Sequence, residues 1–232
     1  MLANKKVLAF IGARSGSKGL LDKNVKVFHG KPLMAWTILA ALSSKHIDKV
    51  IVSTDSNQYA EIAKQFGAEV ILRPAILSDD NASLMDALKH TVETLADHHH
   101  FDVVVNLQPT SPLRTAEHID QALALYEQQG NTKNLRVFSC YQVLNKFAWL
   151  MRTNEQGFAH FIDQHEQHKN HHARQANTDI FLPNGAIFIL PTNDLTRFYN
   201  DSTVPYVMSK ACSIDIDSQA DFDLAAELFP IR

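Results

Sequence analysis

Short apolar runs alternate with amphipathic segments through the first half of the chain, and this alternation constrains the fold most. The runs cover residues 6–11, 50–53 and 103–107, and the last two lack the polar alternation of a half-exposed strand. Strands of this kind are buried on both faces, as in parallel sheets. Helical patterns lie between and after them, over residues 32–43, 56–66, 83–96 and 116–129. This order predicts a Rossmann-like α/β fold whose mostly parallel sheet has helices on both faces.

The chain has 232 residues, of which 45% are hydrophobic and 20% are charged, enough for one domain over residues 1–232 with a full core. From residue 144 to residue 182 the pattern changes, because Asn, Gln and His accumulate and the periodicity weakens. We expect this segment to project from the core as a lid or a dimerisation arm.

The last fifty residues return to regular patterns. A strand is expected at 186–190, and a helix follows that ends near residue 229. Ser218 and Asp221 have the spacing of a capping pair for that helix, as Ser83 and Asp86 have for the helix at 83–96.

Composition excludes several classes of partner. The formal net charge is −3 and the pI is about 6.4, so no broad cationic face is expected for nucleic acid or an anionic membrane. No apolar stretch approaches the roughly 20 residues that span a bilayer. These features predict a cytoplasmic protein. Cys140 and Cys212 are too few for a disulfide framework and lack zinc-like spacing, so both are expected as buried thiols.

A glycine-containing loop rich in cations follows the first predicted strand, at residues 12–24. Gly16 and Gly19 let the backbone turn tightly and bring N–H groups close to a ligand. Arg14, Lys18 and Lys23 supply the positive charge that phosphate oxygens require. The spacing matches neither the dinucleotide fingerprint nor the phosphate loop that ends in Gly-Lys-Ser/Thr. We therefore expect a nucleotide polyphosphate that is bound in another way.

Two aspartates near the end of the chain form a candidate metal site. Asp215 and Asp217 alternate with Ile214 and Ile216, so an extended backbone would direct both carboxylates to one face and both isoleucines to the core. Two carboxylates suit Mg²⁺, which completes its shell with water and substrate phosphates. The alternative is an ordinary strand end with outward polar residues.

Further polar residues follow other predicted strands, where ligands bind in open α/β sheets. The loop from Gln108 to Arg114 contains two prolines and should present Gln108, Ser111 and Arg114 near the strand tips. Alternatively, it is a plain connection in which Thr115 caps the next helix and Arg114 forms a surface ion pair. Arg73 could likewise meet a base or phosphate, or simply pair with Asp80.

These residues belong to motifs spread from residue 8 to about residue 225: Ala13-Arg-Ser-Gly-Ser-Lys-Gly19 with Lys23-Asn24, Val52-Ser-Thr-Asp55, Arg73-Pro74, Gln108-Pro-Thr-Ser-Pro-Leu-Arg114, Pro183-Asn-Gly-Ala-Ile187 and Ser213-Ile-Asp-Ile-Asp217. Together the motifs resemble those of the acylneuraminate cytidylyltransferases, which activate nine-carbon 2-keto sugar acids as CMP-sugars. The resemblance implies transfer of CMP from CTP to the anomeric hydroxyl of such an acid, with release of pyrophosphate. It also implies Mg²⁺ and a homodimer in which a projecting segment closes the neighbour's sugar site.

The resemblance implies roles for individual residues. The catalytic group would be Arg14, Lys18, Lys23, Asp215 and Asp217, with the two aspartates holding the metal. CTP would be bound by Ala13, Arg14, Ser17, Lys18, Lys23, Asn24, Arg73 and Ser83. The sugar acid would meet Gln108, Arg174, Phe188, Phe198 and Tyr199.

Two departures from the family pattern concern the sugar. Leu182 stands where sialic acid enzymes often carry Arg, and Trp149 lies in a region where some present Lys. The missing cations favour a less polar substrate, such as a diacylated legionaminic acid, over sialic acid. The alternatives are another sugar nucleotidyltransferase, such as a CMP-Kdo synthetase, or a nucleotide-binding protein without turnover. Retention of Lys23 together with both aspartates argues against the last.

Overall fold

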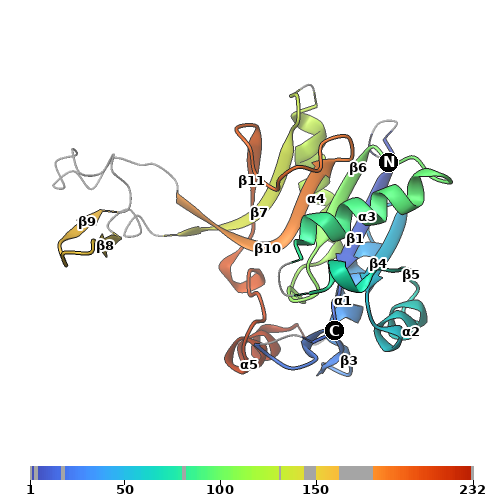
Figure 1. The fold of residues 1–232 in the computed structure, drawn as a ribbon, viewed down its shortest axis with the longest axis horizontal. Coiled ribbons are helices and arrows are strands. Elements are labelled where there is room, and N and C mark those ends of the chain that lie inside the picture. Colours follow the sequence, from blue (N-terminus) through green and yellow to red (C-terminus); the bar gives the residue numbers. More distant parts are fainter. Residues whose placement is uncertain are drawn as a thin grey trace.

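A seven-stranded sheet forms the centre of the molecule (Figure 1). The computed structural model describes residues 2, 5–16, 19–79, 82–130, 132–143, 150–161 and 180–230. The strand order is β11-β7-β10-β6-β1-β4-β5. The strands are β1 (Val7–Gly12), β4 (Lys49–Thr54), β5 (Glu69–Leu72), β6 (Val103–Leu107), β7 (Arg136–Val143), β10 (Ile180–Pro191) and β11 (Thr203–Val207).

Most neighbouring strands run parallel, as the apolar runs predicted. β1 pairs in parallel with both β4 and β6, β4 pairs with β5, and β7 pairs with β11. Among the described strands of this sheet, only β10 runs antiparallel to its neighbours, β6 and β7. After β5 the chain returns past β1 to form β6, so the strand order reverses at the β1–β6 boundary. Loops that leave the carboxyl ends of β1 and β6 diverge there, which opens a crevice for a ligand.

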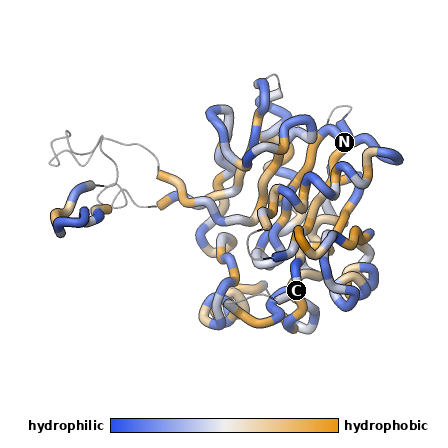
Figure 2. Tube along the Cα trace, viewed as in Figure 1, coloured by the Kyte–Doolittle hydropathy of each residue, from blue (hydrophilic) through white to orange (hydrophobic). Residues whose placement is uncertain are grey.

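Helices cover both faces of the sheet, which confirms the predicted fold class. They are α1 (Leu33–Leu42), α2 (Asn57–Gln65), α3 (Leu84–Ala96), α4 (Ala116–Gln128) and α5 (Gln219–Leu228). Val7, Ala9 and Ile11 point to the core that α1, α2 and α4 share, whereas Leu8 and Phe10 point to the core under α3. Figure 2 shows that the apolar residues concentrate on the central strands.

The predicted helix starts are also confirmed. The Ser83 hydroxyl accepts the Asp86 N–H at the start of α3, and Ser218 and Asp221 form a capping box at α5. Each cap satisfies backbone N–H groups that a helix start leaves without an intrahelical partner.

A third apolar cluster joins the two ends of the chain. Phe28 of the hairpin β2 (Val27–Phe28) and β3 (Lys31–Pro32) packs against Phe222 and Ala225 of α5. Ile216 is fully buried in this cluster and Ile214 packs against it, as predicted for both isoleucines. The cluster thereby brings residues 215–217 next to the loop that follows β1.

The second half of the sheet differs from the sequence prediction. β7 and β11 carry no signal that we recognised, and β10 is longer than the predicted strand at 186–190. β10 begins at Ile180, paired with Val143, and a bulge follows Pro183. This β7–β10 ladder leaves the body of the molecule, and a hairpin of β8 (Met151–Thr153) and β9 (Ala159–Phe161) lies beyond it (Figure 1). Leu150 and Phe158 of that region are exposed.

Candidate active site

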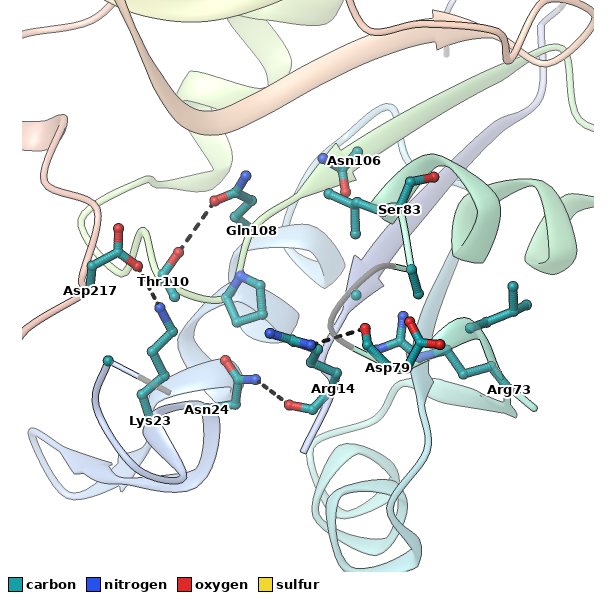
Figure 3. A pocket seen from close by; sticks show the side chains of 16 residues that line it. Arg14, Lys23, Asn24, Arg73, Asp79, Ser83, Asn106, Gln108, Thr110 and Asp217 are labelled. Carbon is teal, nitrogen blue, oxygen red and sulfur yellow. Dashed lines mark hydrogen bonds and ion pairs between the residues drawn. The ribbon is translucent and has the colours of Figure 1, made fainter. Parts of the chain in front are cut away.

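A cavity of about 450 Å³ opens at the carboxyl ends of β1 and β6 (Figure 3). It lies where the reversal of strand order predicts a ligand crevice. The cavity brings together eight residues that the sequence singled out: Arg14, Gly19, Lys23, Asn24, Arg73, Ser83, Gln108 and Asp217. Its polar and charged lining comprises Arg14, Lys23, Asn24, Arg73, Asp79, Ser83, Asn106, Gln108, Thr110 and Asp217.

Hydrogen bonds fix the loop that follows β1. The Ser15 N–H and hydroxyl both donate to Asp55 at the end of β4, at 2.8 and 2.7 Å. Burial raises the pKa of Asp55, but these hydrogen bonds and Arg73 outweigh it, so the pKa lies below its ordinary value. The Asn24 amide donates to the Arg14 carbonyl at 3.1 Å. The described parts of the loop on either side of residues 17–18 are therefore held in place before any ligand binds.

Two cations of the cavity differ in their surroundings. The Lys23 ammonium donates to the Asp217 carboxylate at 2.7 Å and to the Ile216 carbonyl at 2.9 Å. Arg73 is 7% exposed, and no described residue accepts a hydrogen bond from its Nε. Burial lowers the pKa of Arg73, nearby Arg14 lowers it further, and Asp55 opposes both. Arg73 thus presents an incompletely neutralised charge that an anionic ligand would stabilise.

The loop touches the C-terminal aspartate segment directly. A Cβ atom added to Gly19 would lie 2.5 Å from the Asp217 carbonyl oxygen, closer than real Cβ contacts. Only a residue without a side chain fits there. The Gly19 contact and the Lys23–Asp217 ion pair together place the cations and the aspartate in one site.

The two aspartates line different cavities, although the isoleucines that alternate with them both face the core as predicted. Residues 213–217 are not paired in a strand of the sheet. Asp217 is exposed and lines the first cavity, whereas Asp215 lines a second cavity of about 360 Å³. Burial raises the pKa of Asp215, Asp217 raises it further, and a hydrogen bond from Thr110 lowers it. Thr110 also lines the first cavity, so Asp215 lies at the border between the two.

The loop after β6 is only partly as predicted. Gln108 lines the cavity, and its Oε1 lies 3.4 Å from the Thr110 hydroxyl. Arg114 is buried behind the loop, where its Nη2 donates to Thr37 at 2.6 Å and to the Gln108 carbonyl at 3.3 Å. Burial lowers the pKa of Arg114 to about 9. Arg114 therefore supports the loop from behind. It does not line the first cavity, and no carboxylate of the described residues pairs with it, in contrast to both expectations.

The other expectations for this loop have mixed outcomes. Ser111 is buried and does not reach the cavity, in contrast to the prediction. Thr115 does cap α4, in a capping box with His118, as the alternative reading expected. Cys140 is buried as predicted, whereas Cys212 is half-buried.

Two asparagines to which the sequence analysis assigned no role contribute to the site. Asn184 is buried beside the β10 bulge, where it accepts from the Ser139 hydroxyl and donates to the Ser213 hydroxyl. This network ties β7 and β10 to the start of the aspartate segment. Asn106 lines the first cavity from β6. The sequence signal that could have identified Asn106 is its position as a polar residue inside the apolar run Val103–Leu107.

Several predicted residues lie away from the first cavity. Ala13 is buried and its N–H donates to the Ser53 carbonyl. Phe188 packs against Phe198 and Tyr199 with ring centroids 4.9 and 5.7 Å apart, and none of the three rings lines the cavity. Ser17, Lys18, Asp80, Trp149 and Arg174 lie outside the described residues.

The donor set fits a hard divalent cation held by few protein ligands. Within the described ranges, no group of three or more His, Cys, Asp or Glu side chains is placed to hold a metal. Asp215 nevertheless has a buried Oδ1 for which no described residue is a hydrogen-bond partner. A carboxylate pair of this kind suits Mg²⁺, which usually takes one or two carboxylates and obtains its other ligands from water and phosphates.

The fold and the cavity define an α/β protein with a ligand-sized cavity at the point where the strand order reverses. The family model described as Cytidylyltransferase matches residues 8–224, so the chain belongs to this family. An N-acylneuraminate cytidylyltransferase from Escherichia coli is 38% identical over 227 residues, 95% of this chain and 51% of that protein. A CMP-N,N'-diacetyllegionaminic acid synthase from Legionella pneumophila is 34% identical over 236 residues, 98% of this chain and 97% of that protein.

The chain thus spans about half the length of the first of these relatives and nearly all of the second. Among solved structures, a CMP:2-keto-3-deoxy-manno-octonic acid synthetase complexed with CTP superposes with a TM-score of 0.70 at 18% identity, covering 96% of this chain and 98% of that chain. At this identity the likeness concerns the fold. No described helix is long and apolar enough to cross a membrane.

Proposed function

We propose that the protein transfers CMP from CTP to the anomeric hydroxyl of a nine-carbon 2-keto sugar acid and releases pyrophosphate. One observation supports this most: cations of the N-terminal loop and an aspartate of the C-terminal segment line a single cavity. The family membership of the chain points the same way, as do its similarities to an N-acylneuraminate cytidylyltransferase and a CMP-N,N'-diacetyllegionaminic acid synthase.

In this reaction the sugar hydroxyl loses its proton to a base, a carboxylate or a water of the site, and its oxygen forms a bond to the α-phosphorus of CTP. The bond from that phosphorus to the pyrophosphate oxygen breaks, and pyrophosphate leaves. Negative charge accumulates on phosphate oxygens, so positioning and electrostatic stabilisation supply most of the catalysis. Arg14, Lys23 and Arg73 line the cavity and would bind the triphosphate. Lys23 is held on Asp217 and Ile216, so its ammonium is oriented before CTP arrives.

Asp215 and Asp217 would hold Mg²⁺, which would neutralise phosphate charge when bound. The buried free oxygen of Asp215 supports this assignment, because a carboxylate oxygen without a partner is costly unless a ligand completes it. The raised pKa of Asp215 is in line with a site that a cation stabilises.

The sugar acid would occupy the space between the two cavities. Gln108 of the first cavity contacts Gly185 of the second, since a Cβ at Gly185 would lie 2.9 Å from Gln108 Oε1. Leu182 lines the second cavity, where an Arg would have favoured a more polar substrate. This supports a legionaminic acid over sialic acid, and a comparison of kcat/KM for the two acids tests it. A clear preference for sialic acid would refute it.

We further propose a homodimer in which the 144–182 segment of one subunit reaches the sugar site of the other. The β7–β10 ladder leaves the body of the molecule, and the exposed Leu150 and Phe158 would be covered by a partner. Analytical ultracentrifugation should give a mass of twice 26.0 kDa. A monomer that turns over normally would contradict this part.

The activity is tested by mass spectrometry of products formed from CTP, Mg²⁺ and a panel of nonulosonic acids that also includes Kdo. A CMP-nonulosonate is expected, with stoichiometric pyrophosphate. Lys23→Ala should raise the KM for CTP, while Lys26→Ala, which removes a cation bound to Gln219, should not. Absence of any CMP-sugar from the whole panel would refute the proposed function.

A further inference from the structure

Asn106 is the polar exception in a fully buried strand. It is the fourth residue of β6, in the run Val-Val-Val-Asn-Leu, and its exposure is 0%. Neither its amide nitrogen nor its amide oxygen has a hydrogen-bond partner among the described residues. Buried polar groups in native proteins are normally paired, so this side chain calls for an explanation.

The position of Asn106 points to a ligand. Asn106 is in register with Phe10 of β1 and Phe188 of β10, so its side chain shares the sheet face of these two apolar rings. It stands near the carboxyl end of the strand, on the wall of the first cavity. Figure 3 shows it between Gln108 and Ser83, which line the same cavity.

Asn184 shows what a structural asparagine looks like in this protein. Its exposure is 4%, and its amide oxygen accepts from Ser139 and from the Ala186 N–H, while its nitrogen donates to Ser213. Both the amide oxygen and the amide nitrogen of Asn184 are therefore hydrogen-bonded within the protein. The amide of Asn106 contributes nothing comparable to the fold, because an apolar residue of the same size would avoid the cost of an unmade hydrogen bond.

We propose that Asn106 is a substrate-binding residue whose amide pairs with two neighbouring hydroxyl groups at the cavity wall. A primary amide both donates and accepts, which matches a pair of hydroxyls where one accepts and the other donates. This inference rests on the proposed function. The hydroxyls belong either to the ribose of CTP or to the sugar acid, and the two sources are separable by experiment.

The test compares Asn106→Leu, which keeps size and removes hydrogen bonding, with Asn184→Leu as the matched control. Without substrates, Asn106→Leu should keep or raise the Tm, whereas Asn184→Leu should lower it. Asn106→Leu removes both proposed hydrogen bonds and should weaken substrate binding about thirtyfold. Threonine suits a strand and keeps a donor and an acceptor, so the substrate affinity of Asn106→Thr should lie between that of Asn106→Leu and that of the wild type.

Calorimetry with CTP and 2′-deoxy-CTP, without sugar, identifies the source. If the ribose is bound, the wild type prefers CTP and Asn106→Leu loses this preference. If the sugar acid is bound, CTP affinity is unchanged and the KM for the acid rises at saturating CTP. The assignment is overturned if Asn106→Leu lowers the Tm as Asn184→Leu does. It is also overturned if Asn106→Leu leaves both the Kd for CTP and the KM for the sugar acid within twofold of the wild-type values. A wild type that binds no CTP would instead overturn the proposed function.

Discussion

Replacing Gly185 by alanine should separate the cost to stability from the cost to activity. Gly185 has a φ of +73°, in the left-handed region, where an L residue costs about 1–2 kcal/mol. For a chain of this size each kcal/mol lowers the Tm by about 2–4 °C, so a loss of about 2–8 °C is expected. The new Cβ would also lie 2.9 Å from Gln108 Oε1 and 3.2 Å from its Cδ. Because the obstacle is the end of a flexible side chain, Gln108 moves and the backbone stays.

Activity should therefore fall by more than stability explains. A displacement of about 1 Å in a positioning group can cost up to about a hundredfold in rate. We expect kcat/KM for the sugar acid to fall at least about tenfold at saturating CTP, with CTP binding unchanged.

The matched control is Gly30→Ala in the β2–β3 turn. Gly30 has a φ of +79°, and a Cβ there would meet nothing within 4 Å. Both variants should lose similar Tm in calorimetry, but only Gly185→Ala should lose activity towards the sugar. Equal kcat/KM values for the two variants would refute the assignment of Gln108 as a sugar contact.

Three further substitutions test the loop and the aspartates. Gly19→Ala places a methyl group against the Asp217 carbonyl oxygen, so we expect the free energy of unfolding in urea to fall by about 1–3 kcal/mol and the KM for CTP to rise. A wild-type KM would count against the shared site. Asp215 has a raised pKa, so its ionised form lowers stability at pH values above 3.8. Without metal, Asp215→Asn should therefore be more stable than the wild type near neutral pH, and this gain should vanish as the pH falls below 3.8. Asp55 has a lowered pKa, so its contribution to stability is complete at pH values above 3.8 and is lost below this pH. Asp55→Asn should therefore be less stable than the wild type at neutral pH, and the difference in stability should become smaller in acid. Denaturant titrations across pH check both signs, and a pH-independent difference would contradict them.

Local patterns were sufficient for the parallel half of the sheet. The apolar runs of β1, β4 and β6 and the serine caps of α3 and α5 are read within a few residues, and the structure confirms them. β11 escaped prediction because Pro205 interrupts a short strand, which an edge position tolerates since one side of the strand needs no ladder partner. β7 begins with Arg136, a residue atypical of a core strand. Its guanidinium is buried against Asp194 and the Arg197 carbonyl, partners that the sequence does not bring near.

The sequence by itself determined the α/β class, the cation-rich loop and the polar loop ends, because strand and helix periodicities and glycine-containing turns are properties of neighbouring residues. Only the tertiary structure decided which of these meet. Lys23 pairs with Asp217, 194 positions away in the sequence, and Asp215 lines a second cavity. Arg114 is buried behind its loop, and the amide of Asn106 has no hydrogen-bond partner among the described residues. These outcomes depend on packing between distant segments, above all the aromatic cluster that joins α5 to the β2–β3 hairpin, and no local pattern specifies such packing.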